Sequence, residues 1–358
     1  MQATSPPLSD VRKIAILRPN AVGDFVFSLP CLHALRRAYP DARIVYIGKP
    51  WHAEFLAGRP GPVDRVEVIP PCPGVGAPIG ADIDPLPVQR FVESMRAAEL
   101  DLAVQIYGGG HYSNPFITQF GARLTIGLRA ADAPPLDRWI AYGPLQNRRL
   151  QMLEVATLAG ADLLRLESEL AVTDKDRREA CSVLAADVAQ PLVVLQPGAS
   201  DRRRCWPAER FAAVGDALAA AGAVVAVNGT AEEAPVVHEV IERMRHTAMD
   251  LSGRLSLSGL CGLLERASLL VSNDTGPLHL ALAIGTPCVG IYWLTNLMES
   301  APLRQHAHRP AMSLRVHCPV CGEENLKSRC AHDVSFVDGV TVDEVIGLAM
   351  ELFESKRG

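Results

Sequence analysis

Short apolar runs alternate with helical patterns along almost the whole chain, and this alternation restricts the fold more than any other feature. Strands are predicted at 13–17, 43–47 and 102–106, with amphipathic helical patterns between them. A second series contains predicted strands at 192–195 and 269–272. Strands that alternate with helices form parallel sheets through right-handed crossovers, so we predict an α/β fold.

The chain is long enough for two domains of this kind. Its 358 residues exceed one average domain. We predict an N-terminal Rossmann-like, doubly wound domain over residues 1–168 and a C-terminal one over residues 169–358. This division also allows the last helix to pack back toward the N-terminal domain. Ligands of doubly wound sheets bind at the carboxyl ends of the strands, so the expected site is a cleft between the two domains.

The composition disfavours several other classes of protein. The net charge of −5 and the aromatic fraction of 5% argue against a generally basic nucleic-acid binder and against a stacking surface for single strands. Residues 1–13 lack an apolar core, so no secretory signal is expected. Nine cysteines, an odd number in a long chain, are typical of a cytoplasmic protein with reduced thiols.

One uncharged stretch, 276–298, has the length of a membrane span. It contains His279 and is interrupted by a Gly-Thr-Pro turn, both of which are unfavourable in a transmembrane helix. We therefore predict a buried helix at 278–284 followed by a buried strand at 288–293.

The first chemical motif, Arg18-Pro-Asn-Ala-Val-Gly23-Asp24, follows the first predicted strand directly. Gly23 permits a tight turn. Asp24 has two interpretations that the motif alone does not separate. It is either a cap of the next helix or a carboxylate at the cleft edge that accepts a proton from an attacking hydroxyl. The glycines of a dinucleotide-binding fingerprint are absent from this turn.

A second strand end carries small residues followed by arginines, in the segment Gln196-Pro-Gly-Ala-Ser200-Asp-Arg202-Arg-Arg204. Small residues let backbone amides approach an anion, and guanidinium groups add positive charge. Ser200, Arg202 and Arg204 are therefore candidates for a diphosphate site. The alternative is a solvated basic loop, which the position between a strand and a helix disfavours.

A third strand end is followed by Thr230 and Glu232. The Glu232 carboxylate either binds ribose hydroxyls, as acidic residues do in nucleotide-binding βαβ units, or stabilises the first turn of the next helix through its charge. The motif favours neither interpretation over the other.

A fourth strand end carries Asp274-Thr275-Gly276-Pro-Leu-His279 and opens an apolar helix. Amides of Thr275 and Gly276 at the helix N-terminus form a ready anion site. His279 shares this turn with Asp274, which favours ligand contact over the usual core histidine.

A cluster of thiols lies near the end of the chain, at Cys318, Cys321 and Cys330, with His332 beside it. Three thiolates and one imidazole suit a tetrahedral zinc ion. The first pair has good ligand spacing, whereas the second pair is too close for a standard zinc finger. The alternatives are reduced surface thiols or a disulfide.

The motifs resemble those of glycosyltransferase family 9, the ADP-heptose:lipopolysaccharide heptosyltransferases. The resemblance is carried, in family order over residues 12–350, by Arg18…Gly23-Asp24…Pro30, by the segment 197–207, and by Asp-Thr-Gly-Pro-Leu-His-Leu-Ala at 274–281. The Asp-Thr-Gly-Pro-Leu-His-Leu block is the most specific of the three.

The resemblance implies a GT-B fold with two facing Rossmann-like domains and a central cleft. It places the acceptor on the N-terminal domain and the nucleotide sugar on the C-terminal domain, and it implies inverting transfer that requires no cofactor. Asp24 matches the family's general base. The donor-site matches are Ser200, Arg204, Glu232, Asp274, Thr275, Gly276 and His279.

The chain departs from the family pattern at three places. Arg204 stands where the family often has lysine. This replaces the compact charge of an ammonium group with a guanidinium group that can donate two parallel hydrogen bonds. Tyr-Trp-Leu-Thr at 292–295 replaces a Phe-Gly-Pro-Thr turn, which bears on the donor sugar. The late cysteine cluster lacks a final cysteine, with Ser335 nearby.

We therefore expect an inverting transferase that moves a heptose from ADP-heptose to a lipopolysaccharide inner-core acceptor. Arg18, His111 and Arg129 are candidates for contact with acidic groups of that acceptor, the alternative being solvated surface charges. The expected location is the cytoplasm, with peripheral contact at the inner membrane as an option. Alternative functions are transfer from another nucleotide sugar, transfer to a protein, and a non-catalytic nucleotide-binding homologue.

Overall fold

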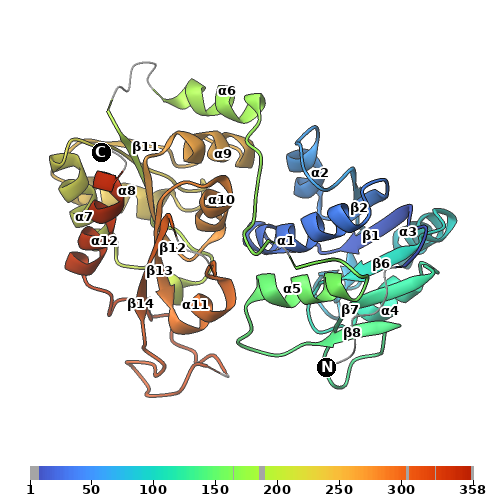
Figure 1. The fold of residues 1–358 in the computed structure, drawn as a ribbon. Coiled ribbons are helices and arrows are strands. Elements are labelled where there is room, and N and C mark those ends of the chain that lie inside the picture. Colours follow the sequence, from blue (N-terminus) through green and yellow to red (C-terminus); the bar gives the residue numbers. More distant parts are fainter. Residues whose placement is uncertain (1–7, 164, 185–189, 304–305, 327, 356–358) are drawn as a thin grey trace. The chain divides into compact units, whose positions relative to one another are not determined.

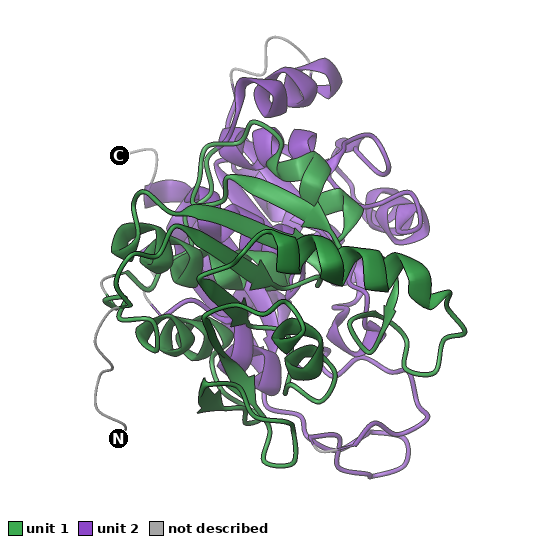
Figure 2. Ribbon diagram, turned by 90° about the vertical axis from the view of Figure 1, so that its right-hand side faces the viewer, with its two compact units in different colours: residues 1–171 green, residues 172–358 purple. Residues whose placement is uncertain are grey.

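The computed structural model describes residues 8–355 except 164, 185–189, 304–305 and 327. The chain forms two compact units, Met1–Ala171 (unit 1) and Val172–Gly358 (unit 2), which Figure 2 shows in green and purple. The structural division follows Ala171, whereas the division predicted from the sequence follows residue 168.

Within its described residues, unit 1 forms a six-stranded parallel sheet in the order β3-β2-β1-β6-β7-β8. This is a doubly wound order that reverses direction between β1 and β6. Helices α1 and α5 pack against each other, and side chains of α3 and α4 share a separate apolar cluster with β1 and β6. Its elements are β1 (Lys13–Leu17), α1 (Val22–Ala38), β2 (Arg43–Gly48), α2 (Pro50–Leu56), β3 (Arg65–Val68), β4 (Cys72–Pro73), β5 (Gly76–Ala77), α3 (Pro85–Ala97), β6 (Leu102–Gln105), α4 (Ser113–Thr118), β7 (Leu124–Arg129), β8 (Arg138–Ala141) and α5 (Arg148–Thr157).

The described part of unit 2 repeats this topology, with a six-stranded parallel sheet in the order β11-β10-β9-β12-β13-β14. In Figure 1, α7 and α12 cover one face of this sheet, and α9 and α10 cover the other. Its elements are α6 (Asp174–Val183), β9 (Leu192–Gln196), the 3₁₀ turn η1 (Arg202–Arg204), α7 (Ala208–Ala220), β10 (Val224–Val227), α8 (Ala234–Arg243), β11 (Ala248–Asp250), α9 (Leu257–Arg266), β12 (Leu269–Asn273), α10 (Gly276–Ile284), β13 (Cys288–Trp293), α11 (Leu294–Ser300), β14 (His308–Ser313) and α12 (Val342–Ser355).

The uncharged stretch at 276–298 folds as predicted, into the buried helix α10 and the buried strand β13. Gly285 ends α10 with a φ of 95°, a left-handed conformation that favours glycine. Among the described residues, no helix combines the length and the apolar character that a membrane crossing needs.

Helix α1 continues through a proline because a distant hydroxyl replaces the lost hydrogen bond. Pro30 lies inside α1 and has no N–H to donate to the Val26 carbonyl, four residues earlier. The Ser168 hydroxyl donates to that carbonyl at 2.7 Å. Ser168 is buried, and the Arg149 side chain of α5 donates to its oxygen at 3.4 Å. The end of unit 1 is thereby joined to its first helix.

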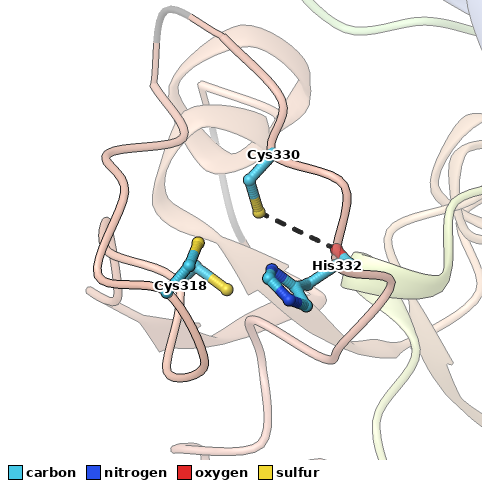
Figure 3. Close-up of side chains that lie close together, drawn as sticks. Cys318, Cys330 and His332 are labelled. Atoms are coloured by element: carbon cyan, nitrogen blue, oxygen red, sulfur yellow. Dashed lines mark hydrogen bonds between the residues drawn. The ribbon is translucent and has the colours of Figure 1, made fainter.

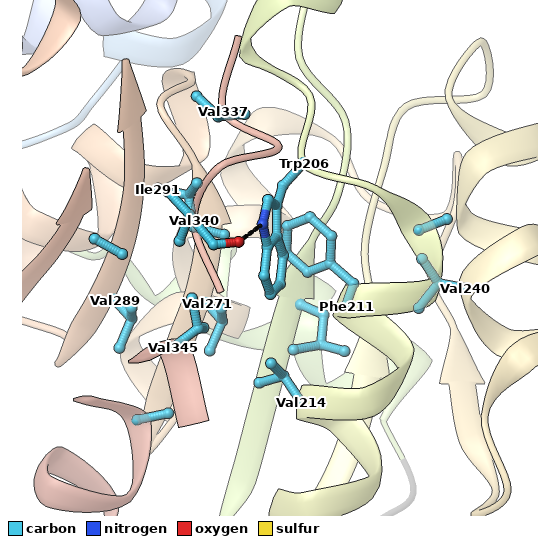
Figure 4. Packing of buried hydrophobic residues seen from close by; sticks show 14 of the residues in the cluster. Trp206, Phe211, Val214, Val240, Val271, Val289, Ile291, Val337, Val340 and Val345 are labelled. Carbon is cyan, nitrogen blue, oxygen red and sulfur yellow. Dashed lines mark hydrogen bonds between the residues drawn. The ribbon is translucent and has the colours of Figure 1, made fainter. Parts of the chain in front are cut away.

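Trp206 is the largest fully buried side chain of unit 2 and packs edge-on against Phe211, with ring centroids 5.2 Å apart (Figure 4). Its indole N–H donates to the Val340 carbonyl at 3.0 Å. Phe336 belongs to the same core, and so do Leu352 and Phe353 of α12. The last helix therefore packs in the core of unit 2.

His52, in α2, is enclosed by aromatic rings of unit 1. Its ring lies against Trp51 with centroids 3.6 Å apart and meets Phe25 edge-on at 5.9 Å. The Lys49 amide donates to His52 Nδ1 at 2.9 Å, which assigns the proton of the neutral ring to Nε2. Burial is the main cause that lowers the pKa of His52 to about 3.

We expect His52 to make the protein sensitive to acid. Its folded pKa lies below its unfolded value, so the unfolded chain binds the extra proton between about pH 6.5 and pH 3, and stability falls as pH falls through that window. His52→Asn should remove up to about 1.4 kcal/mol per pH unit of this slope. Urea unfolding between about pH 7 and pH 5 measures it. The exposed His306→Asn is the control, and an unchanged slope in His52→Asn would contradict the assignment.

Candidate active site

The motifs singled out in the sequence all follow strands at the carboxyl edges of the two sheets. In unit 1, Asp24 comes after β1, next to the point where the strand order reverses. In unit 2, the segments that follow β9 and β12 flank the corresponding reversal. Ligands of doubly wound sheets bind at such points, so each unit presents a candidate site of its own.

Asp24 is held by a buried arginine. Arg18 Nη2 donates to Asp24 Oδ1 at 2.7 Å, and Arg18 Nε donates to the Asp24 carbonyl at 2.8 Å. Arg18 Nη1 bonds the Ile106 carbonyl, and the Tyr46 hydroxyl donates to the Arg18 carbonyl at 2.8 Å. The Asp24 side chain keeps 33% of its surface exposed, against 5% for Arg18. Within the described residues, no hydrogen bond engages Asp24 Oδ2, so this oxygen is available to a ligand.

The capping interpretation of Asp24 is wrong. Helix α1 begins at Val22 and its N-cap is Ala21, which makes no side-chain capping bond. Asp24 therefore lies inside the first turn, where its charge is favourable to the helix dipole, but its carboxylate faces Arg18 and not the backbone amides.

Two other predicted acceptor residues lie at the same edge of the unit 1 sheet. His111 follows β6, and its Nε2 lies 2.8 Å from Asp132 Oδ1. The hydrogen bond from His111 is the main cause that lowers the pKa of Asp132. Arg129 ends β7, donates to the Ala133 carbonyl at 2.8 Å, and lies over the Trp139 ring at 4.9 Å. A role of these residues and of the buried Arg18 in acceptor binding stays a prediction.

In unit 2, Arg204 joins the two loops that flank the strand reversal. Arg204 Nη1 donates to the Asp274 carbonyl at 3.1 Å and lies 3.4 Å from Asp274 Oδ2. Arg204 Nη2 donates to the Ser200 hydroxyl at 3.1 Å. The Arg202 side chain is exposed at the start of η1. The Arg204 guanidinium and the Ser200 hydroxyl therefore lie together at the strand end where the sequence predicts a diphosphate site.

Asp274 is a buried carboxylate with several partners. His279 Nε2 lies 3.0 Å from Asp274 Oδ1, and the Ser300 hydroxyl donates to the same oxygen at 2.9 Å. Burial alone would raise the pKa of Asp274, but the hydrogen bond and charge of His279, with the charge of Arg204, lower it below its usual value. The carboxylate thus contacts His279 through Oδ1 and Arg204 through Oδ2. Ser300, at the end of α11, carried no signal in the sequence.

Arg203 points away from this network and into the protein. It donates to both oxygens of Asp201, with Nη2 to Oδ2 at 2.7 Å, and lies over the Trp293 ring at 5.3 Å. Burial would raise the pKa of Asp201, but the Arg203 hydrogen bonds lower it. Of the three consecutive arginines, Arg204 contacts the Ser200 and Asp274 network, Arg203 pairs with Asp201, and Arg202 is exposed.

Glu232 and its neighbour Glu233 differ in placement. Glu232 is exposed beside Thr230; bonds from its own backbone amide and then from the Thr230 hydroxyl lower its pKa. Glu233 instead reaches back to the strand ends, where it accepts from the Thr230 amide at 2.9 Å and lies 3.4 Å from Gln196 Nε2. A Cβ on Gly198 would approach the Glu233 carboxylate to 2.1 Å, so a larger residue at 198 would displace the Glu233 side chain. Glu233 was not among the predicted site residues, because its contacts with Gln196 and Gly198 join loops that are distant in sequence.

The late thiol cluster assembles in unit 2. The ligand atoms of Cys318, Cys321, Cys330 and His332 all lie within 4.8 Å of one another. Figure 3 shows the side chains of Cys318, Cys330 and His332 pointing toward a common centre. A hydrogen bond from the Asn325 side chain is the main cause that lowers the pKa of Cys330 to about 6, which favours the thiolate that metals bind. These four residues could hold a metal ion.

The structure bears on both non-metal alternatives for the cluster. All nine cysteines, each within the described residues, are free, so no disulfide forms. Cys318 and Cys330 are buried, with 2% and 7% of their surface exposed, whereas Cys321 is exposed, so the surface-thiol alternative holds for Cys321 alone.

Solved structures of similar proteins share this architecture. A glycosyltransferase family 9 protein of Veillonella parvula matches with a TM-score of 0.83 and 19% identity, over 98% of this chain and 100% of that one. The ADP-heptose lipopolysaccharide heptosyltransferase II of Escherichia coli matches with a TM-score of 0.73 and 18% identity, over 97% and 100%. The two Rossmann-like units thus define the GT-B class of glycosyltransferase fold.

The sequence comparisons identify the family. The model of glycosyltransferase family 9 (heptosyltransferase) matches residues 88–325. Lipooligosaccharide heptosyltransferase 2 of Haemophilus influenzae is 24% identical over 316 residues, which cover 82% of this chain and 87% of that protein. The chain belongs to glycosyltransferase family 9 and is a transferase.

We expect Asp274 to hold the unit 2 site together. Asp274→Ala leaves the buried side chain of His279 and the guanidinium of Arg204 without their carboxylate, so the free energy of unfolding should fall by about 3–5 kcal/mol. Urea unfolding measures the loss. As a control, Glu351→Ala removes an exposed ion pair with Arg309, 2.6 Å long, and should cost about 0–1 kcal/mol. If the two variants lose similar free energies of unfolding, the contacts of Asp274 contribute no more to stability than an exposed ion pair does.

Proposed function

We propose that this enzyme transfers a heptose from ADP-heptose to an inner-core acceptor of lipopolysaccharide, with inversion at the anomeric carbon. The observation that carries the proposal is the connected network of Ser200, Arg204, Asp274 and His279 at the strand reversal of unit 2. It combines cationic, hydroxyl and helix N-terminal groups, which suit a diphosphate. The Haemophilus influenzae relative is named as a lipooligosaccharide heptosyltransferase, and the similar Escherichia coli structure as an ADP-heptose lipopolysaccharide heptosyltransferase; both names support the proposal.

In the proposed donor complex, unit 2 binds the nucleotide sugar. Arg204 and Ser200 contact the diphosphate, together with the amides of Thr275 and Gly276 at the start of α10. Arg202 adds charge at the exposed side of η1. Thr230 and Glu232 lie after β10, where the exposed Glu232 carboxylate accepts hydrogen bonds from ribose hydroxyls. Preorganised donors of this kind stabilise the charge that develops on a leaving diphosphate.

In the proposed reaction, Asp24 is the general base. Asp24 Oδ2 takes the proton of the acceptor hydroxyl as the acceptor oxygen forms a bond to the anomeric carbon. The bond from that carbon to the diphosphate oxygen breaks on the opposite face, its electron pair leaves with ADP, and the configuration inverts. Arg18 positions the carboxylate through Oδ1 and leaves Oδ2 to the acceptor. His111 and Arg129 bind acidic groups of the acceptor.

No step of this proposed transfer passes through a cofactor. A zinc ion held by Cys318, Cys321, Cys330 and His332 would be structural. We also place the reaction in the cytoplasm, at the inner membrane. An amphiphilic acceptor and the exposed apolar side chains of Leu314 and Val320 support that location.

The base assignment is tested by Asp24→Asn, which keeps the size of the side chain but cannot accept the proton. We expect kcat to fall by about 10²–10⁴-fold, with ADP affinity unchanged because the donor contacts lie in unit 2. Mass spectrometry of the transfer product measures turnover. Asp41→Asn, at an exposed position after α1, is the matched control. Turnover of Asp24→Asn within a few-fold of wild type would refute the assignment.

The donor assignment is tested by a thermal-shift screen of ADP, UDP and GDP. A nucleotide that binds the native state stabilises it by about 2.7 kcal/mol at 100 times its Kd. We expect ADP to raise the melting temperature most, and Arg204→Ala to abolish the rise. A larger rise with UDP would overturn the heptose donor. ADP binding without transfer to any lipopolysaccharide core would favour the non-catalytic homologue.

A further inference from the structure

The first two thiols of the late cluster are presented by a tight backbone turn. In the sequence Cys318-Pro-Val-Cys321-Gly322, the Gly322 amide donates to the Cys318 carbonyl at 2.9 Å, and the Cys318 amide donates to the Glu323 carbonyl at 2.9 Å. Gly322 has a φ of 77°, in the left-handed region where glycine is preferred. The turn brings two residues that are three apart in sequence to one side, as a shared ion requires.

A buried asparagine fixes the second pair. The Asn325 amide donates to the Val316 carbonyl at 2.9 Å, and its side-chain oxygen accepts from the Cys330 amide at 3.3 Å. Asn325 is 4% exposed. This link holds the segment with Cys330 and His332 next to the turn that carries Cys318 and Cys321. The fold therefore brings the four ligands together, although Cys330 and His332 are only two residues apart in the sequence.

The cluster has the chemistry of a metal site. His332 Nδ1 is buried and has no hydrogen-bond partner among the described residues, so an ion at the centre would satisfy it. Tetrahedral zinc with bonds of about 2.3 Å to sulfur needs ligand atoms about 3.8 Å apart. Ligand atoms that already lie within 4.8 Å of one another require only a small contraction.

The segment that follows these ligands is bonded directly to the loop that carries Arg204. The Ser335 hydroxyl donates to the Cys205 carbonyl at 2.7 Å, and the Phe336 amide donates to the Arg203 carbonyl at 2.8 Å. Phe336 is fully buried beneath this loop, with its ring 5.0 Å from that of Trp293. The backbone of residues 203–205 is therefore held by two hydrogen bonds from residues 335 and 336.

A charged contact extends this connection. Arg329, next to Cys330, lies 4.0 Å from Asp201 Oδ1 and also pairs with Asp333. Asp201 accepts from the Arg203 amide at 3.1 Å and so caps η1. The cluster segment thus contacts both ends of η1, through Asp201 at its start and Cys205 at its end.

We propose that Cys318, Cys321, Cys330 and His332 bind one zinc ion, and that this ion braces η1 so that Ser200 and Arg204 are preorganised for the donor diphosphate. The second half of the proposal rests on the donor function proposed above. Zinc takes no part in the chemistry; it fixes the segment 329–336, which in turn positions the arginine loop.

The metal is tested by elemental analysis of the purified full-length protein. We expect about one zinc per chain, and loss of most of it in Cys330→Ser. Cys181→Ser, an exposed thiol of the same unit, should keep the full amount. No bound zinc after incubation with zinc ions, or iron in its place, would overturn the assignment.

The brace is tested with variants that leave the zinc ligands intact. Ser335→Ala removes one hydrogen bond to the loop, so ADP should bind about 5-fold more weakly, while the zinc content stays unchanged. Ser182→Ala, whose hydroxyl bonds only its own helix at Glu179, should leave both quantities unchanged. Removal of zinc from the wild type by a chelator should weaken ADP binding at least as much as the Ser335→Ala substitution does.

A second measurement separates this proposal from the donor function. Hydrogen exchange of the amides at 202–206 reports the loop without any nucleotide, and chelation should speed it at least about 5-fold. Faster exchange without ADP binding to the zinc-loaded wild type would refute the donor function and keep the brace. Unchanged exchange and unchanged ADP affinity after zinc removal would refute the brace. Because the exchange and affinity measurements use the wild-type chain, they test the brace even if Cys330→Ser fails to fold.

Discussion

The buried carboxylate of Asp274 is the interaction on which the unit 2 site depends. It lies at the end of the central strand β12 and meets three groups from three different segments: Arg204 of η1, His279 of α10 and Ser300 of α11. A charge in the interior is tolerated only when such partners compensate it. The same compensation fixes where each partner lies, so the contacts that compensate this charge also set the geometry of the candidate anion site.

Unit 1 uses the opposite arrangement for its carboxylate. There the arginine is the buried partner, with 5% of its side chain exposed, and the carboxylate of Asp24 remains accessible. Arg18 satisfies the Ile106 carbonyl as well, which ties the loop after β1 to the neighbouring strand β6. In unit 2 the buried carboxylate of Asp274 positions the more exposed guanidinium of Arg204. In unit 1 the buried guanidinium of Arg18 positions the more exposed carboxylate of Asp24. These complementary roles suit a donor site and a base, respectively.

The alternation of strands and helices, and most strand-end motifs, could be predicted because they depend on local patterns. The strand β14, His-Arg-Pro-Ala-Met-Ser, has no strand pattern and contains Pro310; it forms because β13 supplies a pairing edge. Glu233 and Ser300 were missed for a similar reason, since their partners are distant in sequence. The spacing of Cys330 and His332 argued against a metal site, and only the contact of Asn325 with both halves of the cluster segment explains how they meet.

The proline in α1 has a consequence for how the protein is made. The Val26 carbonyl finds its donor in Ser168, 142 residues further along the chain. During synthesis the first helix is exposed long before that hydroxyl leaves the ribosome, so the helix must wait for the last part of its own unit. Such distant closures slow folding and prolong the exposure of apolar surface. Unit 1 therefore completes the hydrogen bonding of its first helix only after most of its own chain has been synthesised.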